Sequence, residues 1–188
     1  MMMTIRIEQV RWENETQCKH YFELLNTLAT SEVTGFTKPL DWERFQTVIE
    51  VLAPHPYASA YLAYNVETNF PVGALTCYEN FSTFYFAPVF NVHDLVVHPT
   101  ARGQGVAKQL MAHFEAIARA EKAAKLTLEV QSTNQIALSF YLSLGFSPEL
   151  QGVELPPCNL FLEKFLDYST EPLTAQTTQL IKEAIYHA

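Results

Sequence analysis

The chain has 188 residues, 48% of them hydrophobic, which is enough to bury a sizeable core in one domain. Its 20 acidic and 12 basic residues give a formal net charge of -8, which disfavours binding to nucleic acid or anionic membranes. Three widely spaced cysteines without a Cys-x-x-Cys pair indicate free thiols and no metal site.

The amino terminus does not have the pattern of a signal peptide. Arg6 and Glu8 interrupt the apolar run that a signal peptide needs, and no later run is long enough to span a membrane. We therefore expect a cytoplasmic protein that binds neither membranes nor nucleic acid.

The first half of the chain predicts one strand, two helices and then a meander of three antiparallel strands. Alternating apolar residues predict a strand over residues 4–10, and helical spacing predicts helices over residues 16–28 and 42–52. Asp41 is expected to cap the second helix. Short β-rich runs separated by turn residues then predict strands over residues 60–64, 72–78 and 89–97.

The second half begins with a strand, a glycine turn and a helix. An apolar stripe that includes Val106, Leu110 and Phe114 predicts the helix, and residues 126–130 predict the next strand. A strand-helix-strand unit has parallel outer strands, so we expect an α/β fold with a mixed sheet. A short helix over residues 134–144, two strands over residues 146–150 and 159–164, and a helical extension over residues 169–188 complete the prediction, with the main domain at residues 1–168.

The glycine turn has the pattern of an anion-binding site. Unpaired backbone N–H groups and the helix dipole at a helix start favour phosphate. A dinucleotide-binding fingerprint requires a third glycine or alanine where Lys108 stands, and the sequence lacks the Gly-Lys-Ser/Thr triplet of a P-loop. Neither of these two nucleotide motifs is therefore present.

The turn Arg102-Gly103-Gln104-Gly105-Val106-Ala107 resembles the acetyl-CoA loop of the GNAT superfamily of N-acetyltransferases. The resemblance implies a mostly antiparallel sheet flanked by helices, with acetyl-CoA as cosubstrate. It also implies that the turn holds the pyrophosphate, and that the strand before it pairs with the pantetheine arm and donates a backbone N–H to the carbonyl oxygen. The residues implicated in cofactor binding are Leu95, Val96, Val97, Arg102, Gly103, Gln104, Gly105, Val106, Ala107, Lys108 and Asn134. Lys108 has the alternative of being a solvated helix residue.

A downstream segment from Asn134 to Phe146 resembles the Asn, Ala, Tyr and Gly-Phe pattern of the same superfamily. The resemblance implies that Asn134 contacts the cofactor and that Tyr141 is the general acid for the thiolate. The alternative for Tyr141 is a core aromatic at a helix end.

The candidate bases are His93 and Asp94. Asp94-Leu95-Val96-Val97 resembles a strand of diamine and polyamine acetyltransferases, although His93 replaces an acidic residue and Val96 an aromatic one. The alternatives are a strand residue packed beside its neighbours for His93 and a structural, hydrogen-bonding carboxylate for Asp94. The superfamily's substrate region corresponds to residues 27–41 and 81–90, so an amine pocket is expected from the following residues: Glu32, Phe36, Tyr78, Glu79, Phe84, Tyr85 and Phe86.

The sequence thus favours an N-acetyltransferase that acts directly on a primary amine of a small molecule, with a diamine or polyamine as a finer hypothesis. The alternatives are acetylation of a peptide, a protein or an aminoglycoside, and a non-catalytic module that binds acetyl-CoA. Binding of another nucleotide at the turn is a further alternative. A homodimer is also a hypothesis.

Overall fold

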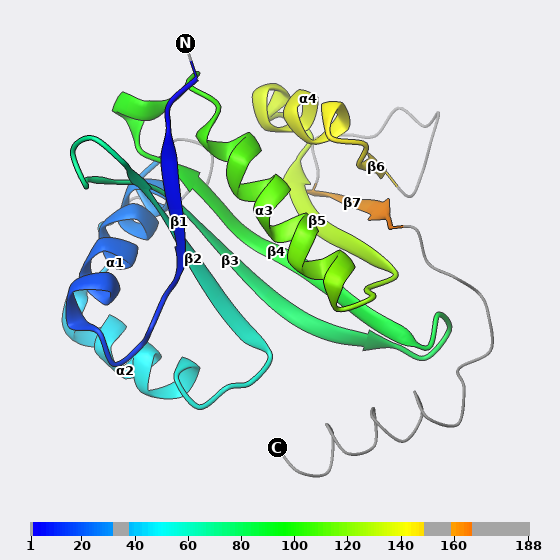
Figure 1. Ribbon diagram of the computed structural model, residues 1–188, viewed down its shortest axis with the longest axis horizontal. Coiled ribbons are helices and arrows are strands. Elements are labelled where there is room, and N and C mark those ends of the chain that lie inside the picture. Colours follow the sequence, from blue (N-terminus) through cyan, green and yellow to red (C-terminus); the bar gives the residue numbers. More distant parts are fainter. Residues whose placement is uncertain (1, 32–37, 149–158, 167–188) are drawn as a thin grey trace.

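The structure is a computed structural model that describes residues 2–31, 38–148 and 159–166. Its elements follow the predicted order (Figure 1). They are β1 (Ile5–Gln9), α1 (Glu15–Ala29), α2 (Trp42–Leu52), β2 (Ala58–Asn65), β3 (Pro71–Ser82), β4 (Ala87–Val97), the short 3-10 helix η1 (Pro99–Ala101), α3 (Val106–Ala120), β5 (Lys125–Gln131), α4 (Gln135–Ser143), β6 (Ser147–Pro148) and β7 (Asn159–Phe165).

The described strands form one mixed sheet in the order β1-β2-β3-β4-β5-β7-β6. Strands β4 and β5 pair in parallel, and every other neighbouring pair is antiparallel. Helix α3 connects the two parallel strands, as the strand-turn-helix-strand pattern predicts. The predicted mixed α/β fold is therefore confirmed.

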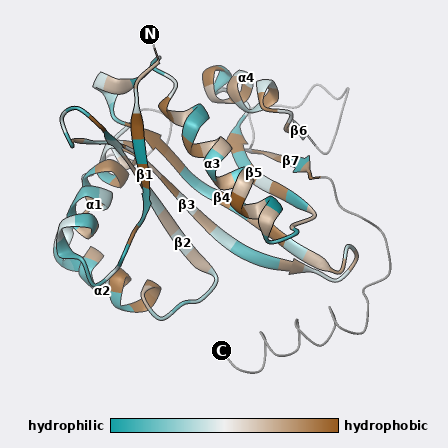
Figure 2. Ribbon diagram, in the orientation of Figure 1, coloured by the Kyte–Doolittle hydropathy of each residue, from teal (hydrophilic) through white to brown (hydrophobic). Residues whose placement is uncertain are grey.

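Helices cover the sheet on both faces and bury a core on each. One core joins α3 to the sheet through residues such as Phe114 and Leu128, and the other joins α1 and α2 through Tyr21 and Phe45. Figure 2 shows hydrophobic residues along the strands and more hydrophilic ones over much of the outer helix surfaces. This distribution is that of a two-sided layered fold.

Local sequence signals place the helix starts correctly. The Asp41 side chain accepts a hydrogen bond from the Arg44 N–H at 2.8 Å and caps α2, as predicted. Asn14 caps α1 in the same way through the Gln17 N–H. Cys18 and Cys77 are free, buried thiols, as expected. Cys158, the predicted extension over residues 169–188 and part of the predicted strand over residues 146–150 lie outside the described residues.

None of the described helices has both the length and the hydropathy needed to cross a membrane.

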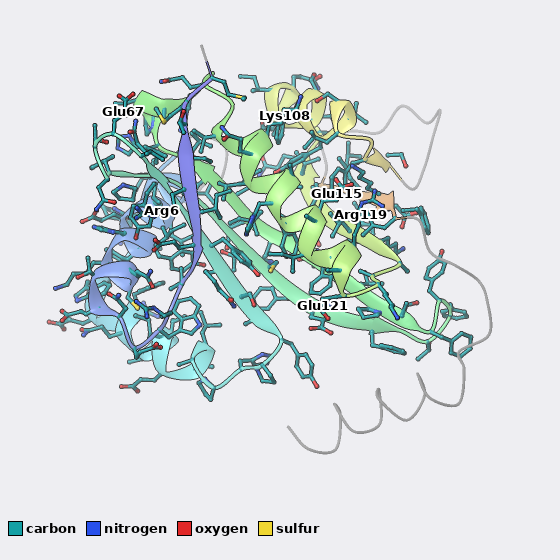
Figure 3. All side chains as sticks on the ribbon, in the orientation of Figure 1. Arg6, Glu67, Lys108, Glu115, Arg119 and Glu121 are labelled. Atoms are coloured by element: carbon teal, nitrogen blue, oxygen red, sulfur yellow. The ribbon has the colours of Figure 1, made fainter. Side chains whose placement is uncertain are left out.

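An ion-pair cluster ties the exposed side of α3 to the sheet. Glu115 receives hydrogen bonds from Arg119 on α3 at 2.8 Å and from Lys164 on β7 at 2.6 Å (Figure 3). Although burial raises the pKa of Glu115, these two partners lower it below its ordinary value. The carboxylate therefore bridges the helix and the strand.

The first turn of α3 lies unusually close to β3 at Gly73. A Cβ atom on Gly73 would stand 2.9 Å from Val106 Cγ1, 3.1 Å from Leu110 Cδ1 and 3.1 Å from the Val96 carbonyl oxygen. Only glycine permits this approach, because even a methyl group would overlap the stiff Val106 side chain. Since Gly73 pairs with Val97 at the end of β4, this contact also fixes where the helix starts relative to that strand.

Replacing Gly73 by alanine is expected to lower the free energy of unfolding by ~1–3 kcal/mol through overpacking. Urea denaturation of the variant measures the loss. Val106→Ala removes the nearest atom. The double variant should therefore lose less free energy of unfolding than the two single variants lose in total. A Gly73→Ala protein as stable as the wild type would contradict this close packing.

Candidate functional site

Strand β4 contains one residue more than its partner β3 at His93. Thr76 pairs with Asp94 and Cys77 pairs with Val92, so His93 has no opposite residue. This is a β-bulge, which bends a strand and changes the direction of its side chains. The predicted catalytic pair His93 and Asp94 therefore lies at an irregularity of the strand.

The bulge reverses the alternation of side chains along β4. Phe90 and Val92 belong to the core beneath α3, and after the bulge Leu95 and Val97 pack against that same core. Val96 belongs to the core beneath α1 and α2. Asp94, two residues before Val96, lies on the α1 side of the sheet as well. His93 also faces that side, because its ring packs edge-on against Tyr78, with ring centroids 5.2 Å apart.

Beyond the bulge, β4 and β5 no longer pair. The parallel ladder ends at Val92 and Leu128, although β4 continues to Val97 and β5 to Gln131. Figure 1 shows the two strands diverging toward the start of α3 and toward α4. From His93 to Val97, the edge of β4 that faces β5 has no strand partner within the described residues. Leu95, Val96 and Val97 thus offer only backbone groups on this edge.

The glycine turn lies at the end of this open edge. Gly103 and Gly105 have positive φ angles of 73° and 78°, which favour glycine. Within the described residues, the N–H groups of Gly105, Val106, Ala107 and Lys108 have no hydrogen-bond acceptor. Four backbone donors therefore remain for an anion at the start of α3.

Two polar side chains of the predicted loop stabilise the loop itself. Arg102 Nε donates to the Val97 carbonyl oxygen at 3.3 Å, and Gln104 Nε2 donates to the Thr100 carbonyl oxygen at 2.9 Å. Lys108 is exposed on the first turn of α3, on the side of α4 (Figure 3). Its ammonium group is accessible to a phosphate.

Helix α4 carries the other two predicted residues. Asn134 is the N-cap, and its side-chain oxygen accepts a hydrogen bond from the Ala137 N–H at 3.2 Å. Tyr141 lies in the last turn, with its ring packed against Phe140 and Phe146. Within the described residues, its hydroxyl forms no hydrogen bond. Asn134 thus caps α4, a structural role that was not predicted from the sequence. The Tyr141 hydroxyl stays available to donate a hydrogen bond to a ligand.

The charge of Asp94 acts on tyrosines from three elements. Burial and the charge of Asp94 raise the pKa of Tyr141 to about 12. The same two causes raise the pKa of Tyr78 on β3 and that of the buried Tyr21 on α1, whose hydroxyl is 2.5 Å from the Thr76 hydroxyl. The sequence reading missed Tyr21 and Thr76, because no motif marks them.

Most of the predicted amine pocket does not assemble near Asp94. Tyr78 does, but Phe84 and Phe86 are exposed at the turn before β4, and Tyr85 packs on Phe165 of β7. The seven residue-to-residue steps from Phe86 to His93 span roughly 23 Å of extended chain, which separates the turn from the bulge. Glu79 lies near Glu121 of α3, on the opposite face from Tyr78. The predicted residues Glu32 and Phe36 lie outside the described residues.

The geometry fits a ligand with an extended arm and a phosphate group. The open edge of β4 offers backbone hydrogen-bonding groups along its length, and the unpaired N–H groups at its end form an anion site without a charged side chain on each oxygen. Acetyl-CoA has this shape, with a pantetheine arm that ends in a thioester. The turn does not match a dinucleotide-binding fingerprint, because Lys108 stands where that fingerprint has glycine or alanine.

The sequence profile of the Acetyltransferase (GNAT) family matches residues 21–146. That range holds β4, the glycine turn, α3 and Tyr141, and it covers more than half of the chain. The chain therefore belongs to this family, and it is an N-acetyltransferase that uses acetyl-CoA. No curated protein matches the chain in sequence.

Solved structures share the fold but bear names that refer to different substrates. A chain of the NatC complex with Gag peptide and CoA has a TM-score of 0.66 at 19% identity, covering 87% of this chain and 99% of that one. An aminoglycoside acetyltransferase from an uncultured soil metagenomic sample gives 0.63 at 21%, covering 82% and 95%. A ribosomal-protein-alanine N-acetyltransferase from Brucella melitensis biovar Abortus 2308 gives 0.63 at 18%, covering 81% and 99%. These similarities establish the fold and leave the acceptor open.

Proposed function

We propose that this chain transfers the acetyl group of acetyl-CoA directly to a primary amine of a small molecule, with a diamine or polyamine as the acceptor class. The observation that carries the proposal is the Asp94 carboxylate next to His93, whose ring packs on Tyr78, at the point where β4 and β5 separate. A carboxylate and aromatic faces both attract an ammonium group. The net charge of -8 also favours a cationic acceptor.

Bound acetyl-CoA would supply the thioester that a neutral amine attacks. The residues proposed to hold it are Gly103, Gly105 and the first turn of α3 for the pyrophosphate, with Lys108 and Arg102 beside them. The backbone of Leu95, Val96 and Val97 is proposed to hold the pantetheine arm, and Asn134 to contact it with its free amide group. A backbone N–H of this strand would also stabilise the developing negative charge on the carbonyl oxygen.

His93 is proposed as the general base for the amine. Its side chain is exposed and its ring nitrogens form no hydrogen bond within the described residues, so they are available to an acceptor or to a water molecule. An imidazole nitrogen with a free lone pair can accept the proton of an amine directly or through a water molecule. Asp94 is proposed to attract and orient the protonated amine before the proton is removed.

Tyr141 is proposed as the general acid for the leaving thiolate. Because burial and Asp94 raise the pKa of Tyr141 to about 12, its hydroxyl keeps its proton throughout the neutral range. It is therefore a donor and not a base under these conditions.

The remainder of the acceptor is proposed to lie on the same face of the sheet as His93 and Asp94. A depression with a volume of ≈ 340 Å³ is lined by polar and apolar residues of β3, β4, β5 and β7, among them Asn91, Thr127 and Phe161. Asn91 lies two residues before His93 on β4, and from there the depression runs toward Phe81 and Ser82 at the end of β3. Its Nδ2 group donates to the Thr127 hydroxyl at 3.2 Å, which holds the floor of the depression in place.

A panel of acceptors tests the proposal. The panel compares diamines and polyamines with monoamines, peptides with free amino termini, lysine peptides and aminoglycosides. We expect the highest kcat/KM for the diamines and polyamines. Asp94→Asn should raise KM for the diamine about tenfold, because a charge-assisted contact is lost. Glu50→Gln, at an exposed carboxylate on α2, is the matched control. Turnover of peptides alone would contradict the acceptor class, and CoA binding without any turnover would indicate a non-catalytic module.

His93→Ala should lower kcat at neutral pH roughly 10²-fold while leaving the Kd for CoA unchanged. The physical reason is that the base acts on the amine and does not touch the cofactor. His113→Ala is the control, because His113 is also exposed and packs edge-on against a tyrosine, Tyr61, at 5.7 Å on the other face. Unchanged turnover across the pH range would remove His93 from the mechanism.

Tyr141→Phe should lower kcat by about 10²-fold or more, since the phenol proton is lost while the ring packing stays. The ratio of the wild-type rate to the variant rate should stay constant through neutral pH and shrink only as pH approaches the pKa of about 12. Tyr85→Phe, at a half-buried tyrosine in the turn between β3 and β4, is the control. Equal kcat values for Tyr141→Phe and the wild type would exclude the acid role.

A further inference from the structure

The amino-terminal residues before β1 lie against the glycine turn. The Met3 N–H donates to the Gln104 carbonyl oxygen at 3.0 Å, although the two residues are about a hundred positions apart in the chain. The Met2 side chain covers Gly105, where its Cγ atom is 3.0 Å from the position of a Cβ. Figure 1 shows the amino terminus beside the start of α3.

Gln109 completes this contact from the first turns of α3. Its Nε2 group donates to the Met3 carbonyl oxygen at 2.9 Å and to the Gly105 carbonyl oxygen at 3.3 Å. The Gly105 carbonyl oxygen also accepts the helical bond from the Gln109 N–H at 3.1 Å. Met3 thus holds the Gln104 carbonyl oxygen, and Gln109, which also holds Met3, binds the Gly105 carbonyl oxygen.

Holding these carbonyl groups fixes the direction of the anion donors. No peptide bond among the described residues is cis, so each carbonyl group points away from the N–H of the next residue. When Met3 holds the Gln104 oxygen, the Gly105 N–H must point to the opposite side. When Gln109 holds the Gly105 oxygen, the Val106 N–H does likewise.

We propose that Met3, through its backbone N–H, and Gln109, through its side-chain amide, are positioning residues that orient the Gly105 and Val106 N–H groups toward the pyrophosphate of the cofactor. The inference rests on the proposed placement of the pyrophosphate at the glycine turn. It adds a strap from the amino terminus, formed by Met2 and Met3, to a site otherwise made by residues 93–141. Neither residue touches the cofactor, and both act through the peptide groups of the turn.

A backbone substitution tests the strap directly. Met3→Pro removes the N–H that donates to Gln104, whereas Met3→Ala keeps it and removes only the side chain. Isothermal titration calorimetry with CoA should show a Kd about tenfold higher for Met3→Pro and for Gln109→Ala than for the wild type. Met3→Ala and Gln46→Ala, at an exposed glutamine on α2, should bind CoA as the wild type does.

A second donor separates positioning from general loss of structure. S-Acetylpantetheine carries the thioester arm without the pyrophosphate, so its KM should be the same for Gln109→Ala, Met3→Pro and the wild type. Unchanged CoA affinity in both variants, or equal weakening of CoA and S-acetylpantetheine, would overturn the positioning role. A Gly105→Ala variant that binds CoA as tightly as the wild type would instead overturn the placement of the pyrophosphate at the turn, since the added Cβ meets Met2 and strains a residue with φ of 78°.

Discussion

The extra residue in β4 at His93 is the feature on which the site depends. A regular strand would continue to pair with β5 and would leave neither an open backbone edge nor two adjacent polar residues on one face. The bulge ends the parallel ladder at Val92 and carries His93 and Asp94 to the α1 side together. In the proposed site, the cofactor arm follows the open edge of β4 and the acceptor reaches it beside His93 and Asp94.

The electrostatics of the site follow from this placement. Asp94 lies at a half-buried position, and its charge raises the pKa of Tyr21, Tyr78 and Tyr141. One carboxylate thus has two proposed effects, the attraction of a cationic amine and the retention of the proton on Tyr141. The close packing of α3 at Gly73 and the strap of Met2 and Met3 hold the glycine turn, where the pyrophosphate is proposed to bind, in a fixed position relative to β4.

Local patterns in the sequence predicted the order of elements, the Asp41 cap, the parallel β4–β5 pair and the glycine turn, because each depends on neighbouring residues. The bulge could not be predicted, since it depends on the register between β3 and β4. The amine pocket stays a prediction, because Phe84 and Phe86 fall in the superfamily's substrate region by sequence but lie exposed at the end of β4 remote from Asp94. Tyr21 and the contact of Met3 with Gln104 depend on long-range packing that no single-sequence pattern marks.

Amide hydrogen exchange with and without CoA tests the central claim most directly, because it reports on the open edge of β4 and on the anion donors in one experiment. The account predicts slower exchange on CoA binding in residues 93–97 and 105–108, with no change in the turn at residues 83–86. Protection confined to other parts of the chain, with these two segments unchanged, would contradict the claim that the bulge in β4 creates the cofactor site.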